Sequence, residues 1–228
     1  MNEFFMTVMD RRDLIQTAFI EHLWLSFVSI SIACLISLPL GIWVARAKRF
    51  AEPIIGITAI LQTIPSLALF GFLVPIIGLG TNSALIALTV YALLPIVRNT
   101  YTGISRVSPA MIEAASAMGM TANQRLLKIE IPLALPFIMA GIRTATVLTV
   151  GVATLATFVG AGGLGDVIYR GLQGYKPNLI LAGAISVALL AIAFDYILKY
   201  LEKKKNDAER YENRSVGGCL CLVKKELY

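Results

Sequence analysis

The 228-residue chain is 57% hydrophobic and only 15% charged, and its mean hydropathy is +0.75. Soluble domains carry about 25% charged residues, so this composition excludes an ordinary water-soluble surface. The net charge of +6 comes from Lys and Arg clusters between apolar runs, a distribution typical of membrane topology and not of a nucleic-acid-binding face. We therefore expect an all-α membrane protein embedded in the lipid bilayer, with no nucleic-acid partner.

Five apolar runs are each long enough to cross a bilayer, which takes about 20 residues in a helix. They cover about residues 23–45, 53–78, 84–104, 133–159 and 179–198. Pro65 is expected to kink the second run near the middle of the membrane, because proline removes a backbone hydrogen bond. Residues 1–18 are expected to form an external segment, residues 19–199 a transmembrane domain, and residues 200–228 a loosely structured cytoplasmic tail.

Basic residues between the runs predict the orientation of the chain, because cytoplasmic loops carry an excess of Lys and Arg. They follow the first run, separate the third from the fourth, and follow the fifth. These residues are Arg46, Lys48, Arg49, Arg106, Arg125, Lys128 and residues 203–205. The opposite side has fewer, and Arg11 and Arg12 there adjoin acidic residues. We expect a multi-pass cell-membrane protein with its N-terminus outside and its C-terminus in the cytoplasm.

The polar segment of residues 108–132 predicts two short helices joined by a turn on the cytoplasmic side. Its signals are a Ser-Pro start, a glycine suited to a left-handed helix end, and a Thr/Gln capping box. The residues that carry them are Ser108, Pro109, Gly119, Thr121 and Gln124. The second helix is expected over residues 122–130, as a separate element that precedes the fourth membrane crossing.

The first of these helices has one apolar face, formed by Met111, Ala114, Ala115 and Met118. A helix of about ten residues is marginal in water alone, so it needs a surface on which to pack. An amphipathic helix on the inner leaflet would carry Lys and Arg on its polar face, and this one carries only Glu113. An Ala/Met stripe suits a protein groove. Docking on a partner is therefore favoured over packing against the chain itself.

The same segment resembles the EAA signature of permease subunits in binding-protein-dependent ABC importers. The resemblance is carried by Glu113-Ala114-Ala115, by Gly119, and by Ile129-x-Ile131-Pro132, where the usual ending has leucine in place of Ile131. It extends over about residues 19–199 and implies the architecture of a type I ABC importer permease with a coupling helix. The coupling residues it implies are Met111, Glu113, Ala114, Ala115, Met118 and Gly119.

The resemblance also implies the partners of the chain. They are two ATP-binding subunits, an extracellular solute-binding protein, and a second permease subunit, either a like chain or a sister chain. No G-x-x-x-x-G-K-[ST] motif occurs in the sequence, so ATP and magnesium are expected on the ATPase partner. The chain itself is expected to hold no cofactor and to catalyse no reaction.

Three segments are most similar to the osmoprotectant group of these permeases, residues 61–66, 98–103 and 160–166. That group imports glycine betaine, carnitine and choline, and aromatic faces can hold such quaternary ammonium compounds. Candidate residues of the translocation path are Pro65, Tyr91 and Phe158, although an aromatic residue in a span is more often packing. An importer for another small solute, such as an amino acid, remains the alternative within transport.

A membrane enzyme or an assembly scaffold is the alternative from another class. The G-x-G-x-x-G pattern of residues 160–165 lacks the βαβ setting of a dinucleotide site, so its glycines are expected to allow tight turns or close helix contact near the outer mouth. A membrane protease would need Ser with His or paired acids at membrane depth. His22 lies at the outer edge of the first run. Asp195 is expected to pair with Lys199, and Arg143 to extend toward lipid headgroups or line the inner vestibule.

Overall fold

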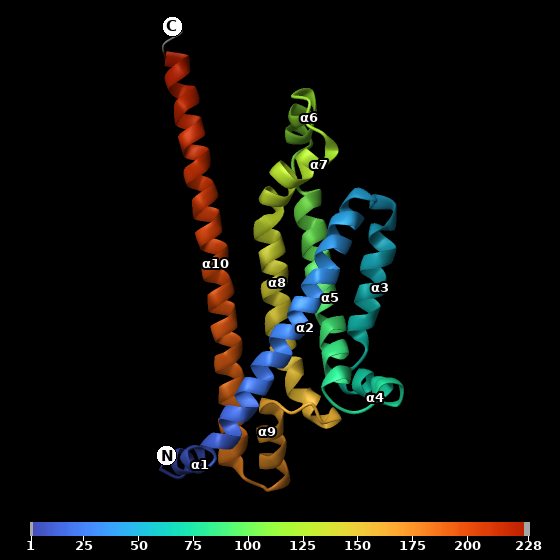
Figure 1. The fold of residues 1–228 in the computed structure, drawn as a ribbon, viewed down its shortest axis with the longest axis vertical. Coiled ribbons are helices and arrows are strands. Elements are labelled where there is room, and N and C mark those ends of the chain that lie inside the picture. Colours follow the sequence, from blue (N-terminus) through green and yellow to red (C-terminus); the bar gives the residue numbers. More distant parts are fainter. Residues whose placement is uncertain (1, 226–228) are drawn as a thin grey trace.

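The computed structural model describes the backbone of residues 2–225 and the side chains of residues 4–203. Figure 1 shows an elongated bundle of helices, and the described part contains no strand. In chain order the elements are α1 (Asn2–Asp10), α2 (Arg12–Arg46), η1 (Lys48–Phe50), α3 (Ala51–Thr63), α4 (Ser66–Ile77), α5 (Thr81–Ser105), α6 (Pro109–Ala117), α7 (Ala122–Arg125), η2 (Leu126–Glu130), α8 (Ile131–Ala153), η3 (Thr154–Val159), α9 (Leu164–Gln173) and α10 (Pro177–Lys225).

The bundle has two distinct ends. The loop with α6 and α7 lies at one end, and α1, α4 and α9 lie at the other (Figure 1). We call these the α6 end and the α9 end. Within the described part, four helices are long and apolar enough to cross a membrane, and α3 with α4 can form a fifth, broken crossing. The predicted all-α architecture with about five crossings is therefore confirmed.

The second crossing differs from its prediction, because it is broken and not merely kinked. Ile64 and Pro65 both leave the helical region, with ψ angles of 125° and 134°, and α4 departs from the line of α3 at an angle of 94°. Proline disfavours a helical conformation in the residue before it, so the chain ends one helix and starts another. The break lies toward the α9 end (Figure 1), so the predicted kink near the middle of the span is wrong.

Helices α2, α5 and α8 form the centre of the bundle and cross one another closely. A Cβ atom on Gly41 of α2 would lie 2.7 Å from the Cβ of Thr100. On α8, a Cβ atom on Gly141 would lie 2.7 Å from the Cβ of Asn99. Small residues at such crossings let two backbones approach, which is the usual basis of helix association in membranes.

The predicted second helix of the polar segment does not stand apart from the fourth crossing. Helix α7 continues through η2, a π-helical turn, directly into α8, so one continuous element spans Ala122–Val159. A helix over residues 122–130 is therefore present as predicted, but it is the first part of the helix of the fourth crossing. Pro132 follows the π-helical turn η2 directly and lies inside this continuous element, so it does not end the helix.

The last helix begins at Pro177 and continues to Lys225, past the predicted end of the fifth crossing. Its Asp195 does not pair with Lys199, because the carboxylate lies 2.5 Å from the guanidinium of Arg143 on α8. The predicted pair is thus wrong, and so is the prediction that Arg143 extends to headgroups. Arg143 faces the neighbouring helix α10. Cys219 and Cys221 lie outside the residues whose side chains the structure describes.

Candidate functional site

The local signals of residues 108–132 produce the expected turns at the α6 end. Pro109 occupies the first turn of α6, although the Ser108 side chain makes no capping hydrogen bond. Gly119 has a φ of +79°, the left-handed conformation that favours glycine. The capping box is complete, since Thr121 N donates to Gln124 Oε1 at 2.9 Å and Gln124 N donates to Thr121 Oγ1 at 3.4 Å.

The predicted apolar face of α6 is divided between surface and interior. Met111 is 49% exposed and Met118 is 73% exposed, and Ala114 and Glu113 are exposed as well. Ala115 is only 1% exposed, so it packs inside the chain's own loop. The surface that remains open to a second protein therefore centres on Met111, Ala114 and Met118, and we call it the α6 face.

Two arginines hold this loop in place, one within the loop and one from the bundle. Arg125 on α7 donates a hydrogen bond to the Ser116 hydroxyl on α6, which joins the two short helices. Arg46, at the end of α2, donates to the carbonyl of Ala122 at 2.7 Å and to Asn123 Oδ1 at 3.5 Å. The sequence interpretation treated both arginines only as topology signals. It missed this role because nothing local in sequence connects residues 76 positions apart.

A third contact connects the base of the loop to α8. The Arg106 guanidinium lies 5.2 Å from the centre of the Phe137 ring, a distance suited to a cation–π interaction. Helix α2 is thus joined to the loop through Arg46, and α8 through Phe137 and through the continuous backbone of α7 and η2. Helix α5 leads directly into the loop at Arg106. A displacement of α6 would therefore act on the centre of the bundle.

Two of the three residues proposed for the translocation path lie together at the break of the second crossing. The buried Tyr91 hydroxyl donates a hydrogen bond to the carbonyl of Ile64, the residue before Pro65. Gln62 Nε2 in turn donates to the carbonyl of Tyr91 at 3.3 Å. These contacts hold the end of α3 against α5. Tyr91 therefore fixes the position of the break.

The third path candidate, Phe158, lies in the 3₁₀ turn η3 and is 51% exposed. Its ring packs edge-on against Tyr169 of α9, with a centroid distance of 5.3 Å. The glycines that follow η3 make a sharp turn, since Gly160, Gly162 and Gly163 all have φ angles between +75° and +84°. The expectation that these glycines serve tight turning is confirmed.

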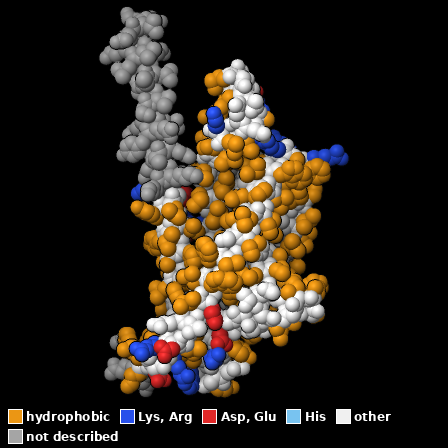
Figure 2. All heavy atoms as spheres, viewed as in Figure 1, with side chains coloured by type: hydrophobic (Ala, Val, Ile, Leu, Met, Phe, Trp, Pro, Cys, Tyr) orange, Lys and Arg blue, Asp and Glu red, His pale blue; other side chains and the backbone are white. Residues whose placement is uncertain are grey.

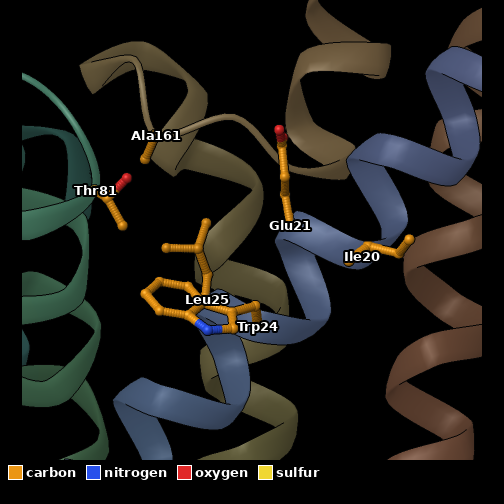
Figure 3. Close-up of a pocket in the computed structure, with 6 residues that line it drawn as sticks. All are labelled: Ile20, Glu21, Trp24, Leu25, Thr81 and Ala161. Atoms are coloured by element: carbon orange, nitrogen blue, oxygen red, sulfur yellow. The ribbon is translucent and has the colours of Figure 1, made fainter.

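An open pocket lies at the α9 end, between α2, the start of α5 and this glycine turn (Figure 3). It has a volume of about 270 Å³, and its lining residues are Ile20, Glu21, Trp24, Leu25, Thr81 and Ala161. The Glu21 carboxylate accepts a hydrogen bond from Gly163 N at 2.9 Å. The buried His22 places Nε2 3.1 Å from the carbonyl of Val150. The sequence interpretation gave neither residue a role, because their partners are distant in sequence.

Comparisons with known proteins agree with the predicted family. Residues 37–207 match the family model described as "Binding-protein-dependent transport system inner membrane component". The chain is 46% identical over 184 residues to the glycine betaine/carnitine/choline transport system permease protein OpuCB of Bacillus subtilis, covering 81% of this chain and 85% of the relative. It is 50% identical over 189 residues to the carnitine transport permease protein OpuCD of Listeria monocytogenes, covering 82% and 85%.

A third relative is the osmoprotectant import permease protein OsmW of Salmonella typhimurium, which is 43% identical over 187 residues, covering 80% of this chain and 87% of the relative. Among solved structures, an inward-facing conformation of the MetNI methionine ABC transporter aligns with a TM-score of 0.77 and 24% identity, over 86% of this chain and 98% of that chain. A second crystal form gives a TM-score of 0.72 and 27% identity, over 87% and 97%.

The structural match confirms the predicted architecture of a type I ABC importer permease. The sequence match covers most of the chain and confirms the family resemblance carried by residues 108–132. Permease subunits of this family are not themselves catalytic, so the membrane-enzyme alternative is not supported. This chain belongs to the family of binding-protein-dependent transport system inner membrane components, the permease subunits of ABC importers.

Proposed function

We propose that this chain is the permease subunit of an importer for quaternary ammonium osmoprotectants, the class of glycine betaine, carnitine and choline. The observation that carries the proposal is an identity of 43–50%, over about four fifths of the chain, to permeases named for these solutes. The methionine transporter is less similar, at 24–27% identity. An amino acid as the solute is therefore the weaker alternative.

The proposed assembly contains two permease subunits, two ATP-binding subunits and an extracellular solute-binding protein. ATP and magnesium would be held by the ATP-binding subunits. Five membrane-crossing helices are few to surround a gated path, which favours a second permease subunit, either a like chain or a sister chain. The family description as a component of a binding-protein-dependent system supports a separate protein that captures the solute outside.

Within this assembly the α6 face would dock in a cleft of the ATP-binding subunit. Exposed Met111, Ala114 and Met118 give it an apolar, adaptable surface, while Glu113 lies exposed beside it. Gly119 lets the chain turn back into α7. When ATP brings the two ATP-binding subunits together, α6 would move with them as a lever, and α7, η2 and α8 would carry that motion into the bundle as a rigid body.

The distribution of charge supports a cytoplasmic location for the α6 end. Arginines near the α9 end lie beside acids, with Arg11–Asp10 at 3.6 Å and Arg12–Asp13 at 3.5 Å. Figure 2 shows Lys and Arg interspersed with Asp and Glu at the α9 end, hydrophobic side chains over the middle of the visible face, and Lys and Arg with few acids at the α6 end. Unpaired basic loops favour the cytoplasm, so the N-terminus would lie outside.

A growth assay tests the solute class. A host that lacks its own osmoprotectant uptake systems would receive this permease together with its ATP-binding and solute-binding partners. At high osmolarity, we expect choline, carnitine or glycine betaine to restore growth, while amino acids do not. A control with the same plasmid lacking only the permease should show no rescue. Rescue by an amino acid alone would overturn the proposed solute class.

A further inference from the structure

We propose that the pocket at the α9 end binds the trimethylammonium head of a solute at the outer side of the permease. The inference rests on the proposed function, because glycine betaine, carnitine and choline share this positively charged group. The pocket is the one described above, between α2, α5 and the glycine turn. Its volume of about 270 Å³ suits a small solute better than a drug-sized ligand, whose sites occupy roughly 300–1,000 Å³.

The shape of the pocket places an acidic group and an aromatic ring around one space. In Figure 3 the Glu21 side chain points up toward the glycine turn, where its carboxylate accepts the hydrogen bond of Gly163 N, and the Trp24 indole lies below it beside Leu25. Thr81 and Ala161 close the opposite side. A cation in this pocket would therefore lie against the indole ring, the aromatic side chain best suited to binding cations, in a wall that also carries the negative charge of Glu21.

The charge of Glu21 is available for such a cation. Its carboxylate accepts one hydrogen bond from the neutral backbone N–H of Gly163, and it forms no ion pair with any residue whose side chain the structure describes. The other acid close to the glycine turn, Asp166, is already paired with Arg170 at 2.7 Å. Glu21 is thus an exposed negative charge with no cationic partner within the described chain.

Trp43, at the opposite end of α2, provides a comparison, because it is a tryptophan for which no cation-binding role is proposed. Trp43 and Trp24 are each 50% exposed, and tryptophans are common at both membrane–water boundaries. Trp43 stacks on Phe50, at a centroid distance of 5.6 Å. Trp24 has no aromatic partner within the described part of the chain and instead lines the pocket beside Glu21. Boundary anchoring alone would explain Trp43, but it does not account for the position of Trp24 in the wall of a pocket that Glu21 also lines.

Fluorescence offers a direct test, because the chain has only two tryptophans. The variant Trp43→Phe leaves Trp24 as the single indole, and Trp24→Phe leaves Trp43. Each full-length variant would be placed in lipid nanodiscs and titrated with choline and with tetramethylammonium, using sodium chloride to match ionic strength. We expect a saturable change in emission from the Trp43→Phe variant and no saturable change from the Trp24→Phe variant.

Two further substitutions, made in the Trp43→Phe background or assayed by uptake, separate the two groups that hold the cation. Glu21→Gln keeps an acceptor for Gly163 N and removes only the charge, and we expect it to weaken choline binding by about tenfold. Trp24→Leu keeps apolar bulk and removes the ring, and we expect choline uptake at low concentration to fall about threefold to thirtyfold. Trp43→Leu is the matched control and should leave uptake unchanged.

The outcomes distinguish this inference from the proposed function. If the assembled transporter takes up choline while Trp24 emission does not respond to it, the pocket proposal is wrong and the proposed function stands. If Trp24 responds saturably but the assembled transporter imports none of these solutes, the pocket proposal stands and the proposed function is wrong. Equal responses from Trp24 and Trp43 would indicate a general effect of the cation on the bilayer and would overturn the pocket proposal.

Discussion

Single glycines set the distance between the central helices. Gly41, Gly103 and Gly141 each lie where a Cβ atom would come within 2.8 Å of a side chain on the crossing helix. Lipid tails are as apolar as the helices themselves, so close packing and not solvent exclusion must hold the helices together. Adding a single methyl group at one of these crossings would therefore have a large effect on the stability of the bundle.

Helix α8 offers a matched pair of glycines for testing this. We expect Gly141→Ala to lower the free energy of unfolding by about 1–3 kcal/mol, because the new methyl group overpacks the contact with Asn99. At Gly151, a Cβ atom would have no neighbouring atom within 4 Å, so Gly151→Ala should be neutral or stabilising by up to about 1 kcal/mol. Denaturant titration of both purified variants measures the difference. Similar losses in both would show that these crossings do not limit stability.

Residue-scale features were predictable where their cause is local in sequence. The glycine end of α6 and the Thr121–Gln124 box follow from signals within a few residues, and both are present. The contacts of Arg46 with Ala122 and of Asp195 with Arg143 join different helices. Composition and spacing do not specify which faces of two helices meet, so an i,i+4 partner for Asp195 was the only pair visible in the sequence.

At the scale of elements, hydrophobic length predicted the number of crossings but not the course of the second one. An apolar run of residues 53–78 satisfies the length rule, whether it forms one helix or two. At the break that Pro65 causes, the Ile64 carbonyl at the end of α3 accepts a hydrogen bond from the hydroxyl of Tyr91, 27 residues away. Only the three-dimensional packing of α3 on α5 shows that the helix can stop there.

The short helix α6 is the element on which the coupling proposal depends. We expect Glu113→Lys and Gly119→Asp to reduce solute uptake at least about tenfold while the protein stays in the membrane, because each alters the exposed surface or its turn. Gln124→Glu is the control, since it adds a charge to the same loop and glutamate can still complete the capping box. Co-purification of the ATP-binding subunit should fall in parallel for the first two variants. Normal uptake in both variants would contradict the proposal that α6 transmits the motion of the ATP-binding subunits.

The ion pair between α8 and α10 makes a second element-scale prediction. Arg143 lies 2.5 Å from Asp195 and 3.9 Å from Glu202, and polar contacts between membrane helices contribute about 0.6–1.7 kcal/mol. We expect Arg143→Asp to lower the free energy of unfolding by about that amount or more, because it places like charges together. The exchanged pair, Arg143→Asp with Asp195→Arg, should recover at least half of the loss. No recovery would mean that the pair contributes nothing specific.

The five crossings alternate in direction between the two ends of the molecule. The chain passes from the α9 end to the α6 end in α2, returns in α3, and passes again in α5 before α8 brings it back and α10 completes the fifth passage (Figure 1). The broken second crossing therefore still returns the chain to the α9 end. Because the number of passages is odd, the first and last residues of the spans lie at opposite ends, in agreement with the alternation of basic loops in the sequence.

Site-directed labelling tests this direction in cells. The labelling variants carry serine in place of the three native cysteines. Tyr175→Cys replaces a residue that is 91% exposed at the α9 end, and Ala117→Cys replaces an exposed residue of α6. We expect a membrane-impermeant maleimide to label Tyr175→Cys in intact cells and Ala117→Cys only after permeabilisation. The reverse pattern would place α6 outside, where ATP-binding subunits cannot reach it, and the α6 face would then need a different partner. Labelling at both sites in intact cells would instead indicate a mixed orientation, which the charge difference between the ends argues against.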